Sequence, residues 1–211
     1  MASLPSVSRD HRRFAWFAAC GLVFLTLPPP AAAQEGTTVR SVQIPGFGAL
    51  RFSAPTAWRI GPVEATEAPA DGGDGAATRG ASFQVTPDGD SHSEMTVSFS
   101  WSEMPDPAFN GPAALRALVE RMGRAALDES IEAHYILHEM RSPHGGGYWF
   151  TLRARAPRKK SQGYLTSGAF GFSNALLRFT FLAPQPDLPE AAAAIDLITG
   201  ARLDDEPAPA P

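Results

Sequence analysis

The most regular hydrophobic pattern in the chain is EMTVSFSWSE, residues 94–103. Apolar and polar residues alternate strictly along it, and the apolar positions are Met95, Val97, Phe99 and Trp101. A period of two predicts a strand with one buried face and one solvated face. ASFQVTP precedes this segment and the polar PDGDSHS separates the two, so we expect a hairpin with an acidic turn.

Similar patterns predict further strands. RSVQI and ALRFSA flank the turn residues 45–48, which indicates another hairpin. Farther along, AHYILHEM, GYWFTLRARA, GYLTSGAFGF and ALLRFTFLA are each strand-like and bounded by turn residues. Pro55 cannot donate to a strand ladder and should end the pairing, three residues before Trp58. We expect Trp58 to be a core residue, because large aromatic side chains dominate core burial.

Two segments have the helical period instead. Residues 112–127 begin with proline, which fits a first helical turn, and carry one apolar stripe. The members of that stripe are Leu115, Leu118, Val119 and Met122. The charge pairs expected on its solvated side are Arg116–Glu120 and Glu120–Arg124. A second helix is predicted over residues 188–198, with Gly200 as its stop.

The order of strands, helix, four strands and helix predicts an α+β fold, an antiparallel β-sheet packed against two or more α-helices. Residues 34–203 are expected to form a single domain. Within it, residues 64–80 are rich in Gly, Ala and acids and are predicted to be a mobile loop. Residues 204–211 are predicted to be a disordered, acidic, proline-rich tail.

Residues 1–33 have the pattern of a secretory signal peptide: a basic start, the apolar run FAWFAACGLVFLTL, and a small-residue cleavage site. Cleavage is expected after Ala33. The alternative is a retained signal anchor, but the run is shorter than the roughly 20 residues of a membrane span, and prolines end it. Lipidation at Cys20 is a second alternative, although much of the apolar run lies beyond that cysteine.

Removal of the leader changes the charge and the available chemistry. The leader holds three of the 18 Lys and Arg residues and one of the 22 Asp and Glu residues, so the remainder has a formal charge of −6. This acidity argues against nucleic acid as a partner. Cys20 is the single cysteine, so the mature chain has no thiol catalysis, cysteine-bound zinc or disulfide. No cofactor, no metal site and no transmembrane segment after signal cleavage are expected.

One basic cluster stands out in this acidic chain. Its members are Arg153, Arg155, Arg158, Lys159 and Lys160. The first two should alternate on one strand face beside Trp149 and Thr151, where they would form a cationic strip for an anionic group. The alternative is a solvated hairpin whose basic residues discourage aggregation at the sheet edge.

Catalytic patterns are incomplete. Ser173 in GFSNA resembles part of a nucleophile elbow, but a strand follows it and no histidine comes later than His144. His134 and His138 would share a metal only on a helix, whereas AHYILHEM alternates like a strand. DGDSHSE, residues 88–94, lacks the glycine and the distal acid of a calcium loop. The three glycines 145–147 lead into a strand, so no phosphate loop is predicted.

The order of elements, together with FSAPTAW read as F-x-x-P-x-x-W, resembles the PsbP-like superfamily, which includes DcrB-like periplasmic proteins. The motif residues are Phe52, Pro55 and Trp58, and the resemblance covers residues 38–203. It implies a PsbP-like α/β/α sandwich used for binding rather than catalysis. No functional residue can be transferred beyond that corner.

Three functional hypotheses follow. The first is an exported, non-enzymatic binding or accessory protein of a bacterial envelope, periplasmic or secreted, whose partner is a protein or an anionic envelope component. The second is a hydrolase whose site forms only in the fold, for example from Glu94, Glu103 or Asp106 near His134. The third is a structural or assembly subunit of an envelope complex.

Overall fold

The computed structural model describes residues 36–67, 79–87, 92–102, 106–157, 162–185 and 189–203. All of them belong to one compact unit, residues 35–211. The predicted leader, residues 1–33, and the predicted tail, residues 204–211, lie outside the described residues. Within the described ranges, no helix has both the length and the apolar character needed to cross a membrane.

The chain is an α+β protein dominated by antiparallel strands, as the sequence predicts. Its strands are β1 (Thr37–Ile44), β2 (Gly48–Pro55), β3 (Arg59–Ile60), β4 (Glu64–Glu67), β5 (Arg79–Thr86), β6 (Glu94–Trp101), β7 (His138–Ser142), β8 (Gly145–Arg153), β9 (Tyr164–Phe172), β10 (Ala175–Ala183) and β11 (Arg202–Leu203). Its helices are α1 (Pro107–Asn110), α2 (Pro112–Leu127) and α3 (Pro189–Thr199).

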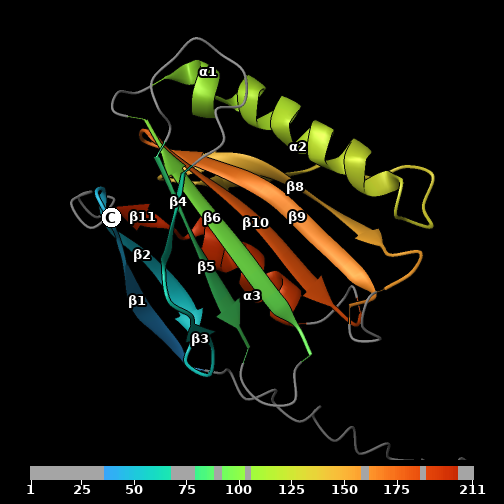
Figure 1. Cartoon of the computed structure of the whole chain (residues 1–211), viewed down its shortest axis with the longest axis horizontal. Coiled ribbons are helices and arrows are strands. Elements are labelled where there is room, and N and C mark those ends of the chain that lie inside the picture. The colour runs from blue at the N-terminus through green and yellow to red at the C-terminus, as the bar shows by residue number, and fades with distance from the viewer. Residues whose placement is uncertain are drawn as a thin grey trace, which may run out of the picture. The chain divides into compact units, whose positions relative to one another are not determined.

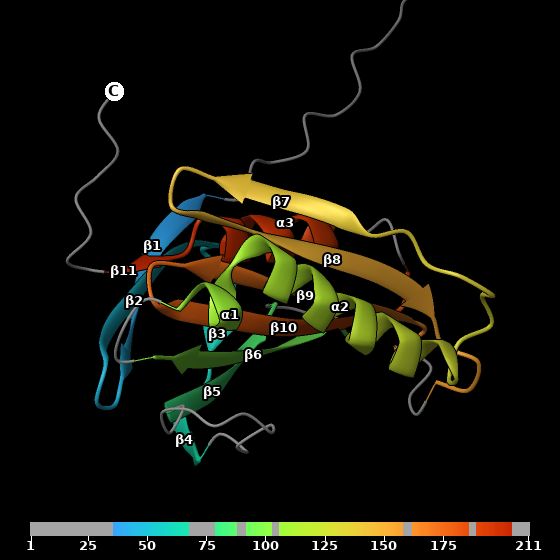
Figure 2. The ribbon, with the colours of Figure 1, turned by 90° about the horizontal axis from the view of Figure 1, so that it is seen from above.

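The strands form two sheets (Figure 1). The large sheet has the order β3-β5-β6-β10-β9-β8-β7, with β4 also pairing with β5, and the small sheet has the order β1-β2-β11. The predicted hairpins β1–β2, β5–β6 and β9–β10 are confirmed, and each is antiparallel. Helix α2 lies over β8 and β9, and α3 lies on the other side of the large sheet (Figure 2).

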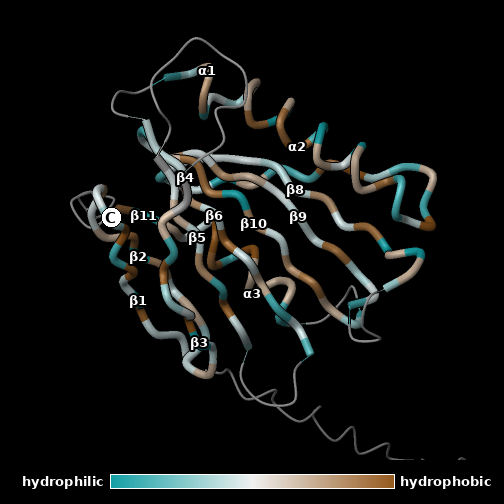
Figure 3. The backbone as a smooth tube through the Cα atoms, viewed as in Figure 1, coloured by the Kyte–Doolittle hydropathy of each residue, from teal (hydrophilic) through white to brown (hydrophobic). Residues whose placement is uncertain are grey.

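The main core fills the space between the large sheet, α3 and the small sheet. The four apolar residues of β6 all point into it, and Phe99 lies against Phe47, Trp101 and Phe172. Alternation places the polar residues of β6 on the opposite face, as the sequence predicts. Figure 3 colours the backbone by hydropathy and shows that hydrophilic and hydrophobic positions both occur along the strands. Trp58 is buried in this core, which confirms its predicted role.

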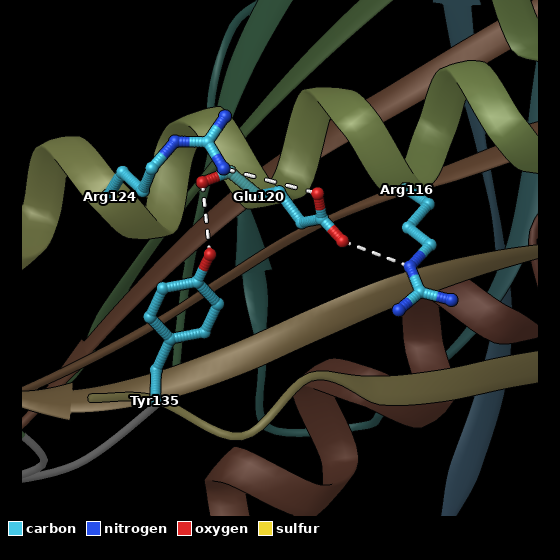
Figure 4. A network of polar contacts seen from close by, with 4 residues as sticks. All are labelled: Arg116, Glu120, Arg124 and Tyr135. Atoms are coloured by element: carbon cyan, nitrogen blue, oxygen red, sulfur yellow. Dashed lines mark hydrogen bonds and ion pairs between the residues drawn. The ribbon is translucent and has the colours of Figure 1, made fainter.

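Helix α2 covers a second, smaller cluster on the other face. Leu115 and Val119 pack there against Phe150 and Leu152 of β8. The helix begins and ends where the sequence predicts, and its expected charge pairs join Glu120 to Arg116 at 2.9 Å and to Arg124 at 4.0 Å (Figure 4). In the same network, the Tyr135 hydroxyl donates to the Glu120 carbonyl at 3.0 Å and ties the following loop to the helix.

The structure corrects three predicted boundaries. The sequence assigns residues 64–80 to a mobile loop, but Glu64–Glu67 forms strand β4. This strand pairs with β5 in antiparallel orientation, and its ladder with β5 satisfies backbone groups that a loop would leave to water. Arg79 and Gly80 belong to β5, and residues 68–78 lie outside the described residues. AHYILHEM is a strand only from His138, because the preceding residues form the connection that holds Tyr135 against α2. The second helix, in contrast, is confirmed: it runs from Pro189 to Thr199, Gly200 follows it as predicted, and Leu188 lies outside the described residues.

Candidate ligand-binding site

A row of three leucines crosses the large sheet on the face covered by α2. Strand register places Leu152 of β8 beside Leu165 of β9, Leu165 beside Leu182 of β10, and Leu182 beside Glu94 of β6. Side chains of directly opposed residues lie on the same face of a sheet. The result is a continuous apolar row that ends in a carboxylate.

A cavity of about 440 Å³ lies over this row, and we call it the leucine cavity. Helix α2 ends at Leu127, and Ala126 of its last turn lines the cavity, so the cavity begins where the helix stops covering the sheet. The remaining lining residues come from the loop after α2, from the end of β8 and the chain after it, and from the chain just before β9; they are Glu129, Ser130, Arg153, Ala154, Ala156, Pro157 and Gln162.

One wall of the leucine cavity is fixed by Ser130, which is 1 % exposed. Its hydroxyl oxygen lies 3.0 Å from the Arg153 carbonyl oxygen, and the residue forms an isolated bridge with Ala154. The Arg155 guanidinium donates to the Ser130 carbonyl at 2.9 Å and 3.2 Å. These bonds join the end of α2 to the end of β8 and hold the wall in place.

Glu132 supports that wall without lining the cavity. Its carboxylate accepts hydrogen bonds from the Ser130 hydroxyl and from the Arg153 backbone amide, the latter at 2.8 Å. Partial desolvation raises the pKa of Glu132, but the hydrogen bonds from Ser130 and Arg153 outweigh it and leave the pKa below its usual range. The carboxylate therefore stays ionised at neutral pH and keeps both bonds.

The polar end of the leucine row is formed by two residues. Gln162 is 8 % exposed, and its side-chain amide donates to Glu94 Oε1 at 2.5 Å. Glu94 itself is exposed, so its carboxylate is accessible from solvent at the rim of the cavity. A carboxylate has about four acceptor positions, and this bond uses one of them. The remaining positions can accept from a ligand.

The predicted basic site is only partly brought together. Trp149 and Arg153 share the face of β8 opposite the leucine row, with Trp149 stacked on His138 at 4.4 Å and Arg153 over the Tyr164 ring at 5.9 Å. Arg155 lies beyond the end of β8 and donates to Ser130, so it does not extend a strip along that strand face. Arg158, Lys159 and Lys160 lie outside the described residues.

The described residues around Ser173 do not have the geometry of a nucleophile elbow. Ser173, with φ of 49°, lies in the turn between β9 and β10, and a strand follows it where a nucleophile elbow needs a helix. It shares a hollow of about 300 Å³ with His144 and Glu139, but the Glu139 carboxylate is paired with Arg141 at 2.8 Å.

The acids and histidines suggested for a hydrolase or a metal are also dispersed. Glu94 begins β6, whereas Asp106 lies beyond its other end and caps α1 by accepting from the Ala108 amide at 2.8 Å. Glu103 lies outside the described residues, and His134 is exposed in the loop before β7. In the part of the chain that the structure describes, no group of three or more His, Asp or Glu side chains could hold a metal ion.

Sequence reasoning missed the leucine cavity, although one signal for it was present. The two-residue turn at Ser173 and Asn174 fixes the register of β9 with β10 and hence the pairing of Leu165 with Leu182. The pairing of Leu152 with Leu165 could not be found this way, because the connection from β8 to β9 is long.

Comparison with known proteins gives no family assignment: no family model, no curated protein and no solved structure matches the chain.

Proposed function

We propose that this protein is an exported, non-enzymatic binding protein of a bacterial envelope, and that it holds a small ligand with an apolar body in the leucine cavity. The cavity carries the proposal. Its volume of about 440 Å³ falls within the range of roughly 300–1,000 Å³ for small-molecule sites. An apolar floor with a few polar groups at one end is also the usual composition of such sites.

The proposal includes a PsbP-like arrangement of the fold and a route out of the cytoplasm. What supports the first is the position of α2 on one face of the large sheet and of α3 on the other. What supports the second is the signal-peptide pattern of residues 1–33. The sequence also predicts that an anionic envelope component or a protein binds at Trp149 and Arg153, and this stays a prediction.

Export makes one direct prediction. When the chain is expressed in a bacterium with an outer membrane, we expect the protein in the periplasmic or medium fraction, with Gln34 as its first residue. N-terminal sequencing of the purified protein measures this. Replacing the apolar residues Leu22 and Leu25 by arginine should keep the protein in the cytoplasm, because the apolar run drives recognition of a signal peptide. An uncleaved chain in the cytoplasmic fraction would contradict export.

Ligand binding is tested with Nile red, a neutral apolar dye whose fluorescence rises on leaving water. We expect saturable binding to the purified protein, weakened about tenfold by Leu165→Asn or Leu182→Asn. Full burial of a leucine side chain contributes about 1.5–3 kcal/mol. Each substitution removes part of this contribution from the contact with the dye, and a loss of about 1.4 kcal/mol is a tenfold loss of affinity. Both leucines are half-buried, so the fold should tolerate the substitutions.

The matched control for the dye experiment is Leu137→Asn. Leu137 is also half-buried and packs against the smaller cluster, but it does not line the leucine cavity. It should lower stability by a similar amount and leave the dye affinity unchanged. Equal loss of affinity in all three variants, or no saturable binding, would refute the proposed function.

A further inference from the structure

The leucine cavity is asymmetric along its floor. Neighbouring strands are about 4.8 Å apart, so the row from Leu152 to Leu182 is about 10 Å long and Glu94 lies one strand farther. An extended eight-carbon chain has about the length of the leucine part. A linear ligand that covers the leucines therefore places its head group beside Glu94.

Two carboxylates line the leucine cavity, and the guanidinium groups nearest to it are directed elsewhere. Glu94 and Glu129 line it, and neither makes an ion pair among the described residues. Arg153 lines it as well, but alternation along β8 puts its guanidinium on the other face, over Tyr164. Arg155 directs its guanidinium to the Ser130 carbonyl. No described cation thus makes an ion pair with Glu94.

Gln162 fixes the position of the Glu94 carboxylate at the end of the leucine row. Its buried amide donates to one oxygen of Glu94 and holds that carboxylate at the end of the row, while the group remains open to solvent on its other side. A protonated amine can donate to the free acceptor positions, and such charge-assisted bonds are stronger than neutral ones. An anionic head group would instead meet like charge.

From these observations we infer that the leucine cavity selects apolar ligands with a cationic head, that is, protonated alkylamines and related amphiphilic amines, with Glu94 as the residue that recognises the charge. The inference rests on the proposed function, because it assigns the ligand class of the same cavity. The assignment of a cationic head group can be wrong while the cavity still binds apolar ligands.

The test compares three ligands with the same chain: octylamine, octanol and octanoate. Each displaces Nile red from the purified protein at pH 7, below the critical micelle concentration. We expect octylamine to bind about threefold to tenfold more tightly than octanol, as a partly exposed ion pair allows, and octanoate to bind most weakly. Glu94→Gln should remove the preference for octylamine over octanol.

Two controls keep the test decisive. Asp196→Asn removes the same charge from α3, on the opposite side of the sheet, and should preserve the preference for the amine. In the unmodified protein, raising the salt concentration should weaken octylamine and not octanol, because salt screens an exposed ion pair. This second measurement does not depend on how Glu94→Gln folds.

The outcomes separate the two claims. Octanoate binding as tightly as octylamine, or a preference for the amine that survives Glu94→Gln and high salt, would overturn the cationic assignment while the binding function stands. Failure of all three ligands and of Nile red to bind would overturn the proposed function, and the cationic assignment with it.

Discussion

Replacing Phe99 by alanine is expected to lower the free energy of unfolding by about 3–5 kcal/mol. Phe99 is fully buried at the centre of the main core, where its ring centroid lies 4.8 Å from Phe47, 5.6 Å from Trp101 and 6.4 Å from Phe172. Truncation removes these contacts and leaves a cavity that neighbouring strands cannot close. Since domains of this size are stable by about 5–15 kcal/mol, the loss is a large fraction of the total.

Urea denaturation followed by tryptophan fluorescence measures this loss. Val39→Ala is the control: Val39 is 60 % exposed on β1, and its truncation should change stability by less than about 0.5 kcal/mol. A loss below about 1.5 kcal/mol for Phe99→Ala would mean that the contacts of this ring contribute little to the stability of the fold.

The second large effect is expected at Gly147, where alanine should cost about 3 kcal/mol or more, the upper end of the range for overpacked sites. A Cβ atom on Gly147 would lie 2.0 Å from the Ala169 carbonyl oxygen and 2.8 Å from the Phe170 Cα atom of β9. Both are backbone atoms of a paired strand, so relief requires β8 and β9 to separate.

The adjacent glycine supplies a matched control for this clash. A Cβ atom on Gly146 would meet nothing closer than the Met140 carbonyl oxygen at 3.4 Å. Gly146→Ala should therefore leave stability unchanged or raise it by up to about 1 kcal/mol, because alanine restricts the unfolded chain. Thermal unfolding followed by circular dichroism compares the two variants. Similar melting temperatures for both would show that β8 can move away from β9 at little cost.

Much of the fold follows from local patterns. Strict alternation found β6, because one of its faces meets the main core and the other is exposed at Glu94 and Thr96, although Ser100 on that second face is buried. The stripe from Leu115 to Met122 found α2 with correct ends, because proline and the change of period mark them. The hairpin turn at Ser173 was predicted for the same reason: the apolar runs on both sides need a reversal.

The rest depends on contacts between distant segments. Strands β3, β4 and β11 are too short to show a period, and they exist because β5 and β2 offer them an edge. The sequence predicts that Arg155 continues a basic strand face, but its guanidinium donates to the carbonyl of Ser130, 25 residues earlier. The leucine cavity requires that β8, β9, β10 and β6 pair in the observed register and that α2 ends beside them. Of these pairings, only that of β9 with β10 is set by a short turn that can be read from the sequence.

The two faces of the large sheet are anchored differently, and this bears on how the leucine cavity responds to an occupant. Its floor belongs to strands β8, β9 and β10, and the last two also carry residues of the main core on their other face. Its roof is the terminal turn of one helix that rests on the smaller cluster. Bonds of Ser130 with Arg153 and Arg155 also tie the chain after that turn to the end of β8. On the proposed function, a cavity held on both sides keeps its shape when an occupant enters, so discrimination among molecules of fitting length falls to the carboxylate at the rim.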